Sequence, residues 1–559
     1  MKISYSFLLL TLLLQSCKKE KKIIESYPSI HIANPKTIAL DTNQLKTWAY
    51  MDMVTDTIPG IGLDKVYTDL IPDKTGDTIT VAIIDMEVDI EHEDLKDNIW
   101  HNTKEIPDNN RDDDDNGYTD DIHGWNFLGN LKGENNVYVN YEYTRILKTY
   151  DSLFNNKEID TILETNRKIY QTYKRAQKKY KERLDFANNE VKNANYILST
   201  YTNAKKVLMP YFPEKDYSLV KLDSLKNSIG KSDKEIMDYL VILTDFLTYN
   251  LNEKWTLENK RVADERIDKL LNKYYNDRSI TGDDPNNIED IAYGNPYVSM
   301  NADFLDHGTL VAGVIAANRT NAIGAKGVTD LVKIMPLCIS AYGDEHDKDM
   351  ALAIRYAVAN GAKIINISSS KEFSLHQDWV TAAIRYAAEK DVLIVTSAGN
   401  DGYDLDEPDI YNYPDDTDAQ GNEVVDTFIK VSSSGYTLDK NLKHISSSYG
   451  KKEVDIFAPG EEIYTTNPSN TYGSNNGTSF AAPIVAGVAA LIRSYYPSLS
   501  AAEVKDILMK SGTAYHIDIE IEQEDGSKKL VPFSELSKSG KIVNAYNAMI
   551  LAEKLVKAK

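Results

Sequence analysis

The sequence predicts an α/β fold in which a mainly parallel central sheet is flanked by helices and carries an inserted α-helical hairpin or bundle. Short apolar strands, such as residues 363–367 and 392–396, alternate with amphipathic helices, such as residues 348–360 and 378–390. This alternation is typical of parallel sheets, whose strands are joined by helical crossovers. The bundle is predicted by residues 131–292, where glycine nearly vanishes and apolar residues recur three or four apart.

The composition is that of an acidic globular protein. The chain has 559 residues, of which 42% are hydrophobic and 26% charged, as is ordinary for a folded domain. Its formal net charge of −22 argues against a nucleic-acid partner, because phosphate binding needs a basic face. Cys338 lies in an apolar strand, so we expect a packed core thiol and no intramolecular disulfide.

The first 16 residues have the features of a signal peptide. Lys2 precedes an apolar stretch, residues 7–14, that is too short to span a bilayer. It ends in Leu-Gln-Ser-Cys, which resembles a bacterial lipobox and implies cleavage before Cys17 and lipidation of that cysteine. We therefore expect an exported bacterial lipoprotein, anchored to a membrane and facing the periplasm or the cell surface. A plain cleaved signal peptide is the alternative, and residues 17–50 are predicted to form a polar tether.

Residues 51–130 are predicted to form the first part of the main domain. An apolar strand over residues 78–85 ends on Asp85, and an acidic loop follows. In this loop Asp112, Asp114 and Asn116 stand at every second position and precede a glycine. This spacing places hard oxygen ligands on one side of a tight loop, as calcium prefers. A solvated acidic loop is the alternative.

Residues 131–292 form the predicted helical insertion. The apolar pattern predicts a long amphipathic helix over about residues 159–198, a break near Pro210, and further helices over residues 236–251 and 262–271. The insertion could act as a lid, as an arm that docks a protein partner, or as a spacer. A tolerated surface insertion is the alternative.

Ser479 is the candidate nucleophile. A turn of small residues delivers it to the start of an apolar helix, where free N–H groups and the helix dipole favour the negative charge of an acyl-transfer intermediate. Serine needs a base within hydrogen-bond reach and a carboxylate that orients the base. His307 is the candidate base, His92 is a competing candidate, and Asp85 is the candidate carboxylate.

The chain order Asp85, His307, Ser479 resembles that of the subtilisin-like serine peptidases, or subtilases. The resemblance rests on three segments, Val-Ala-Ile-Ile-Asp, His-Gly-Thr-Leu-Val-Ala-Gly and Gly-Thr-Ser-Phe-Ala-Ala-Pro. It implies a serine endopeptidase that acts on polypeptides without a catalytic metal. It also implies that residues 51–130 and 293–559 are two parts of one peptidase domain, the second with a C-terminal embellishment that includes a hairpin over residues 517–533.

The resemblance also implies roles for further residues. Asn400, in a Ser-Ala-Gly-Asn segment, takes the place of the amide that holds the oxyanion. The segment with Ser368, Ser369 and Ser370 takes the place of the strand that pairs with the substrate backbone and walls the S1 pocket.

A second structural calcium site is implied at Asp94 and Asn321. The chain departs from the family at Met86 and Glu87, where a small hydroxyl residue and glycine usually follow the aspartate, so we expect altered hydrogen bonding around Asp85.

Two other functions compete with the peptidase. One is a catalytically inert, membrane-tethered binding or scaffolding protein on the same fold, against which the intact set of four catalytic groups argues. The other is a lipid or ester hydrolase, which usually carries Gly-x-Ser-x-Gly and another triad order.

Overall fold

The computed structural model describes residues 29–30, 39–229, 233–251, 253–301, 304–418, 420–523 and 525–559. The predicted signal peptide and Cys17 lie outside the described residues. Cys338 is a free thiol buried in a strand, as predicted.

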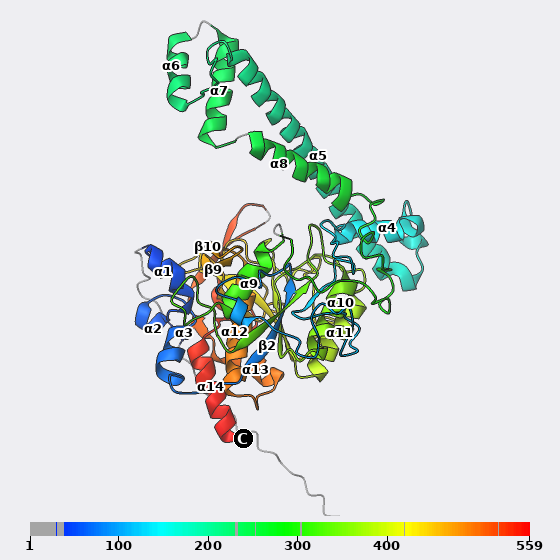
Figure 1. Cartoon of the computed structure of the whole chain (residues 1–559), viewed down its shortest axis with the longest axis vertical. Coiled ribbons are helices and arrows are strands. Elements are labelled where there is room, and N and C mark those ends of the chain that lie inside the picture. The colour runs from blue at the N-terminus through cyan, green and yellow to red at the C-terminus, as the bar shows by residue number, and fades with distance from the viewer. Residues whose placement is uncertain are drawn as a thin grey trace, which may run out of the picture.

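The main domain is built on a ten-stranded sheet with the order β1-β11-β14-β8-β7-β6-β5-β2-β4-β3 (Figure 1). Every neighbouring pair is parallel except β11 and β14, so the mainly parallel sheet is confirmed. The strands are β1 Ser29–Ile30, β2 Ile79–Asp85, β3 Trp125–Asn126, β4 Val332–Cys338, β5 Ile364–Ile367, β6 Leu393–Ser397, β7 Phe428–Ser434, β8 Ile456–Pro459, β11 Thr513–Tyr515 and β14 Lys541–Ile542.

Helices cover both faces of the sheet. Because successive side chains of a strand point to opposite faces, Val81 and Ile83 of β2 pack with α9 and α12, whereas Ala82 and Ile84 pack with α10 and α11. α12 is long and apolar enough to cross a membrane, but 94% of it is buried, as in a core helix. The helices of this domain are α9 Asp306–Ala316, α10 Asp347–Ala359, α11 Gln377–Glu389, α12 Thr478–Tyr495, α13 Ala501–Ser511 and α14 Ala545–Ala558.

Two antiparallel hairpins stand outside the sheet. β12 (Asp518–Glu522) pairs with β13 (Lys528–Pro532), where the sequence predicts a hairpin. β9 (Ile463–Asn467) pairs with β10 (Thr471–Asn475) just ahead of α12, and this hairpin was not predicted.

Packed structure begins before residue 50, inside the span predicted as a tether. β1 pairs with β11 at the edge of the sheet. α1 (Thr42–Thr47) is capped by Asp41 and leads into Trp48, which is buried in the core and donates through Nε1 to the Glu461 carbonyl at 2.9 Å. Short helices α2 (Met53–Asp56) and α3 (Leu63–Lys65) follow.

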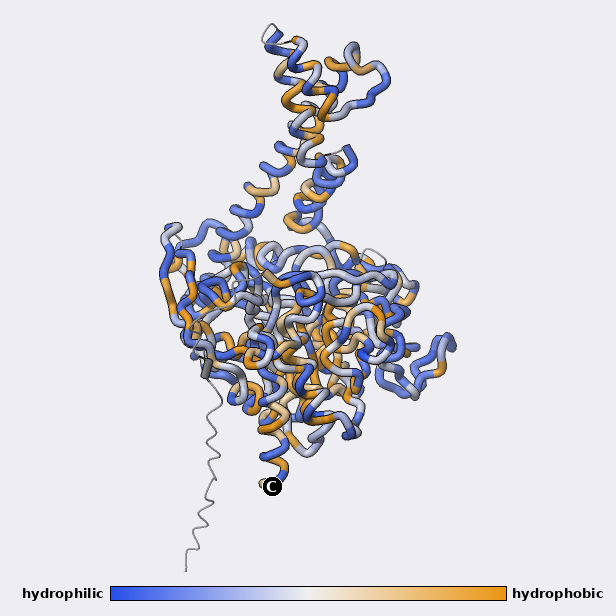
Figure 2. Tube along the Cα trace, turned by 90° about the vertical axis from the view of Figure 1, so that its left-hand side faces the viewer, coloured by the Kyte–Doolittle hydropathy of each residue, from blue (hydrophilic) through white to orange (hydrophobic). Residues whose placement is uncertain are grey.

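Between β3 and α9 the chain forms a narrow helical projection, residues 142–270, which we call the arm (Figure 1). Hydrophilic residues are prominent along it, while apolar residues gather inside the main domain (Figure 2). The expected long helix, α5, starts at Arg167 rather than near residue 159, because residues 159–166 form two 3-10 turns. The arm contains α4 Glu142–Phe154, α5 Arg167–Leu208, α6 Leu219–Ile229, α7 Lys234–Thr248 and α8 Glu253–Glu265.

The chain that returns from the arm is anchored to α10 by buried ion pairs. Arg278 pairs with Asp283 at 2.8 Å and with Asp349 at 2.7 Å, and all three side chains are at most 3% exposed. Lys348 also pairs with Asp283, at 2.6 Å. Since losing one partner would leave a buried charge uncompensated, these pairs hold the arm's root in one position on the main domain.

Candidate active site

The carboxyl end of β2 and the start of α9 bring Asp85 and His307 together. His307 Nδ1 lies 2.7 Å from Asp85 Oδ1, which also accepts the Met86 backbone N–H at 2.7 Å. Asp85 is buried, whereas the His307 side chain is 33% exposed and therefore open to a substrate. The competing candidate His92 is fully buried and bonds to backbone atoms of Asp94 and Thr471, so it is not placed to act as the base.

The departures after Asp85 have structural consequences. Asp85 Oδ2 is buried and has no hydrogen-bond partner among the described residues, as expected where Met86 supplies no side-chain donor. Glu87 is buried and accepts the backbone N–H groups of Met300 and Asn301 at 2.6 and 2.8 Å. Burial raises the pKa of Glu87 above its usual value, and these hydrogen bonds offset only part of the rise. Glu87 therefore ties the end of β2 to the segment that precedes His307.

Ser479 lies at the start of α12. Its Oγ donates to the Ser368 carbonyl at 3.0 Å, and Ser368 Oγ donates to the Ser479 carbonyl at 2.8 Å. Gly477 just before the helix has φ 137°, a left-handed conformation that favours glycine. Within the described part of the chain no hydrogen bond joins Ser479 to His307, although the His307 ring lies beside Phe480, with ring centroids 6.0 Å apart.

Asn400 follows β6 and reaches the start of the same helix. Its Oδ1 accepts the Thr478 backbone N–H at 2.9 Å and the Thr478 hydroxyl at 3.1 Å. These bonds fix the orientation of the amide and leave its Nδ2 donor unengaged by any residue that the structure describes. The structure thus places a free amide donor next to Ser479, where the sequence predicts one.

The Ser368–Ser370 segment continues β5 past the nucleophile. A Cβ added at Gly399 would lie 3.1 Å from Ser370 Oγ and 3.0 Å from Asn412 Nδ2. Ser370 and Asn412 therefore both lie close to Gly399, the residue before Asn400, and sequence reasoning missed Asn412.

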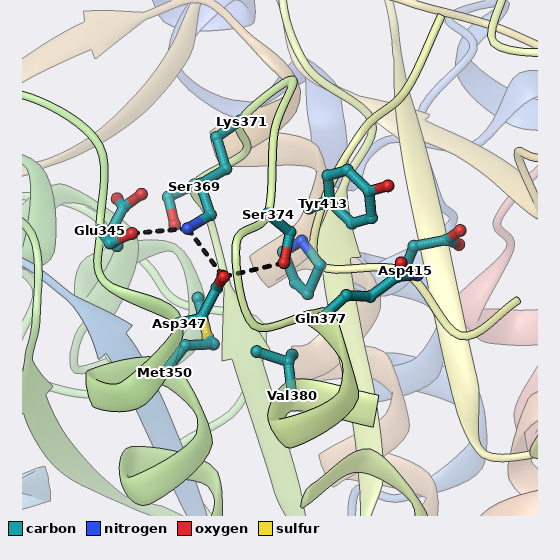
Figure 3. Close-up of a pocket in the computed structure, with 11 residues that line it drawn as sticks. Glu345, Asp347, Met350, Ser369, Lys371, Ser374, Gln377, Val380, Tyr413 and Asp415 are labelled. Atoms are coloured by element: carbon teal, nitrogen blue, oxygen red, sulfur yellow. Dashed lines mark hydrogen bonds and ion pairs between the residues drawn. The ribbon is translucent and has the colours of Figure 1, made fainter. Parts of the chain in front are cut away.

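The buried ion pair of Lys371 and Asp347 lies directly after this segment and holds it to the start of α10 (Figure 3). Lys371 Nζ donates to the Glu345 carbonyl at 2.6 Å and pairs with Asp347 at 2.8 Å, and Asp347 also accepts from Ser374. Burial lowers the pKa of Lys371, but the charges of Asp347 and Glu142, with the hydrogen bond to Asp347, together outweigh it, so the net pKa is raised and the ammonium persists. The cavity here measures only about 10 Å³, too little for a ligand, so the cluster anchors the segment.

The two predicted calcium sites differ in how well their residues fit a cation. Glu105, Asp112 and Asp114 each offer a carboxylate oxygen, all within 4.8 Å of one another, and Asp114 Oδ1 is buried without a partner. Asn116 instead uses its Oδ1 to accept the Tyr118 N–H at 2.7 Å. Sequence reasoning missed Glu105, because it lies outside the alternating acidic run.

At the other predicted calcium site protein donors occupy both Asp94 oxygens, as backbone N–H groups occupy those of Glu105 and Asp112 at the first, so the distinguishing feature of the first site is Asp114 Oδ1. Asp94 accepts from Asn321 Nδ2 and from the Ala325 N–H, and Asn321 Oδ1 accepts the Ile323 N–H. The structure brings Asp94 and Asn321 together, and calcium at this pair stays a prediction.

Comparison with known proteins identifies the family. A family model described as the Subtilase family matches residues 76–531. The chain belongs to the subtilase family. Subtilisin DY from Bacillus licheniformis is 36% identical over 219 residues, which cover 38% of this chain and 73% of that protein. Membership supports serine-type endopeptidase activity for this subtilase.

A further relative and a solved structure match this subtilase over different shares of their length. Subtilisin-like protease 1 from Plasmodium vivax is 32% identical over 243 residues, which cover 40% of this chain and 37% of that protein. Among solved structures, the Prenylagaramide maturation protease PagA is 25% identical with a TM-score of 0.35, over 44% of this chain and 82% of that one.

The pKa of His307 sets an expected pH dependence for this subtilase. Burial lowers the pKa of the ring, but the charge of Asp85 and its hydrogen bond outweigh burial, so the net pKa lies above the usual 6.5. A general base must be neutral, so activity falls as pH drops through this raised pKa. We expect the acid limb of kcat/KM for peptide hydrolysis to have its midpoint above pH 6.5; a midpoint below that value would contradict the assignment of His307 as the base.

Proposed function

We propose that this subtilase hydrolyses peptide bonds of proteins through an acyl-enzyme formed on Ser479. His307 acts as the general base and acid, Asp85 orients the imidazole, and Asn400 with the Ser479 backbone N–H holds the oxyanion. The observation that carries the proposal is the 2.7 Å contact between His307 Nδ1 and Asp85 Oδ1, beside a helix that starts with Thr478 and Ser479.

The first step requires a change at Ser479. Its hydroxyl leaves the Ser368 carbonyl, turns to His307 Nε2 and gives up its proton as Oγ attacks the substrate carbonyl. Catalytic hydrogen bonds are often loose in substrate-free structures and tighten on binding. The C–N bond then breaks as His307 protonates the leaving amine, and water, activated by the same ring, hydrolyses the ester.

The substrate is an extended polypeptide that pairs with the segment containing Ser368, Ser369 and Ser370. Main-chain hydrogen bonds to such an edge supply affinity without selecting a sequence, so side-chain pockets supply the selection. The proposal rests on the position of this segment, which bonds directly to Ser479.

A fluorophosphonate probe tests the proposal, because it reacts only with an activated serine. We expect the wild-type protein to be labelled on Ser479, as located by mass spectrometry of the peptide, and to hydrolyse casein. A folded protein that is neither labelled nor active would favour the inert scaffolding alternative, which the family comparisons do not support.

Calcium binding at Glu105, Asp112 and Asp114 is part of the proposal. The support is the converging carboxylates and the unpartnered Asp114 Oδ1, which a hard cation would satisfy. Such an ion would hold the acidic loop in place and take no part in the reaction.

Calcium is expected to raise the melting temperature. An ion that binds only the folded state adds about 2.7 kcal/mol when free calcium is a hundredfold above its Kd. Thermal melts with calcium and with EDTA should therefore differ for the wild type, and should coincide for Asp114→Asn. Asp94→Asn is the control for the other site: if it alone removes the difference, calcium binds there instead.

Membrane anchoring through lipidated Cys17, in an exported bacterial lipoprotein, also remains a proposal. Its support is the Leu-Gln-Ser-Cys sequence that ends the apolar leader. A protein partner for the arm stays a prediction.

A further inference from the structure

A second cavity lies where the arm meets the main domain. It measures about 230 Å³ and is lined by Arg183 and Phe186 of α5 and, from the main domain, by Ser370, Asp401, Tyr403 and Tyr411. Ser370 ends the predicted substrate-pairing segment, and Asp401 directly follows Asn400. The cavity therefore adjoins the catalytic groups, and one of its walls comes from the arm.

Direct contacts hold α5 against this site. Lys179 pairs with Glu372, two residues beyond Ser370, and Arg175 donates to the Glu372 carbonyl at 3.3 Å. The Arg175 guanidinium also lies over the Tyr411 ring, 3.9 Å from its centroid. These contacts fix the part of the cavity wall that α5 forms to the segment that is predicted to pair with substrate.

The charges around the cavity are mixed in sign. Asp344 lines the cavity without an ion pair to a described residue, and burial raises its pKa to about 6. Lys179 is neutralised by Glu372, Arg266 by Glu190 and Lys371 by Asp347. Arg183 and Asp401 contribute opposite charges, and neither forms an ion pair with a described residue. Because groups of both signs are interspersed in the lining, it does not single out a carboxylate or an ammonium group.

Aromatic side chains contribute several of the remaining lining residues. Phe186 is 51% exposed although it sits on a mostly polar helix, and Tyr403 and Tyr411 are exposed at the same cavity. Ligand pockets are typically lined by aromatic side chains with a few polar groups, and aromatic rings attract one another beyond the effect of the area that they bury. At about 30 Å³ per water, the cavity has room for roughly seven waters, which suits one large side chain.

We propose that the arm completes a substrate subsite that accepts a large aromatic side chain of the polypeptide, on the same side of the scissile bond as the S1 pocket. Phe186 is the specificity-determining residue that the arm contributes. This inference rests on the proposed peptidase function, and it gives the arm a direct part in substrate selection.

A positional-scanning peptide library tests the subsite. We expect the wild type to prefer an aromatic residue over alanine at one position on the P1 side of the scissile bond, and Phe186→Ala to reduce that ratio of kcat/KM about tenfold, which corresponds to about 1.4 kcal/mol. Tyr196→Ala is the matched control, because Tyr196 is an aromatic on the same helix, is 69% exposed and does not line the cavity. It should leave the ratio unchanged.

Binding measurements separate failure of the subsite from failure of the peptidase. If the wild type is labelled by fluorophosphonate but Phe186→Ala keeps the wild-type ratio, or the position prefers a charged residue, the subsite proposal is wrong and the peptidase stands. If the wild type is neither labelled nor active, anisotropy of fluorescent hexapeptides with tyrosine or alanine, measured on Ser479→Ala with and without Phe186→Ala, decides. If Phe186→Ala lowers the affinity for the tyrosine peptides tenfold and leaves the affinity for the alanine peptides unchanged, the subsite is supported. If the proteins with and without Phe186→Ala bind the tyrosine peptides equally, the subsite proposal is overturned.

Discussion

Replacing Ser479 with alanine is expected to lower kcat for peptide hydrolysis by about 10⁶-fold, the loss known for the same change in subtilisin itself. The reason is that Ser479 is the group that forms the acyl-enzyme: His307 and Asn400 remain in the variant, but they have no nucleophile to activate and no oxyanion to stabilise. Turnover of a peptide substrate, measured with protein freed of any contaminating protease, checks this expectation.

The Ser479→Ala variant must also remain folded if its loss of activity is to be assigned to the missing nucleophile. Alanine loses the hydrogen bond from Ser479 Oγ to the Ser368 carbonyl, which contributes about 0.5–1.5 kcal/mol to the free energy of unfolding. Ser498→Ala, an exposed serine just beyond the end of α12, is the matched control and should retain full activity. Equal activity in Ser479→Ala and the wild type would overturn the mechanism.

The sheet could be predicted, and the four candidate catalytic residues could be proposed, from sequence because their signals are local. The strand that ends in Asp85 is a continuous apolar run, and Ser479 stands between a small-residue turn and an apolar helix. Each signal spans about ten residues and needs no knowledge of what packs against it.

Features that depend on distant partners could not be predicted. From the sequence, Glu87 is only a departure from the family. Its structural role depends on the backbone N–H groups of Met300 and Asn301, which lie more than 200 residues away in the chain. Trp48 looks like the end of a tether, but its indole donates to the carbonyl of Glu461. The wall that α5 adds to the cavity depends on the contact of Lys179 with Glu372, which no pattern within either segment indicates.

Replacing Asp85 with asparagine is expected to lower kcat by about 10⁴-fold. Asp85 Oδ1 accepts from His307 Nδ1 at 2.7 Å, which keeps the proton on Nδ1 and leaves Nε2 free to accept from Ser479. An asparagine amide that donates to Nδ1 would move the proton to Nε2, and the ring could no longer act as the base. Because the charge of Asp85 raises the pKa of His307, the acid limb of the residual activity should also move to lower pH.

Glu87→Gln is the matched control, since it removes a buried carboxylate two residues away without touching the ring. Its amide oxygen can still accept the N–H groups of Met300 and Asn301, so kcat should change far less than in Asp85→Asn. If kcat falls by a similar factor in both variants, the carboxylates at the end of β2 affect activity by positioning the backbone that precedes His307. A large loss in Asp85→Asn alone, with the shifted acid limb, would assign the effect to the protonation state of the imidazole.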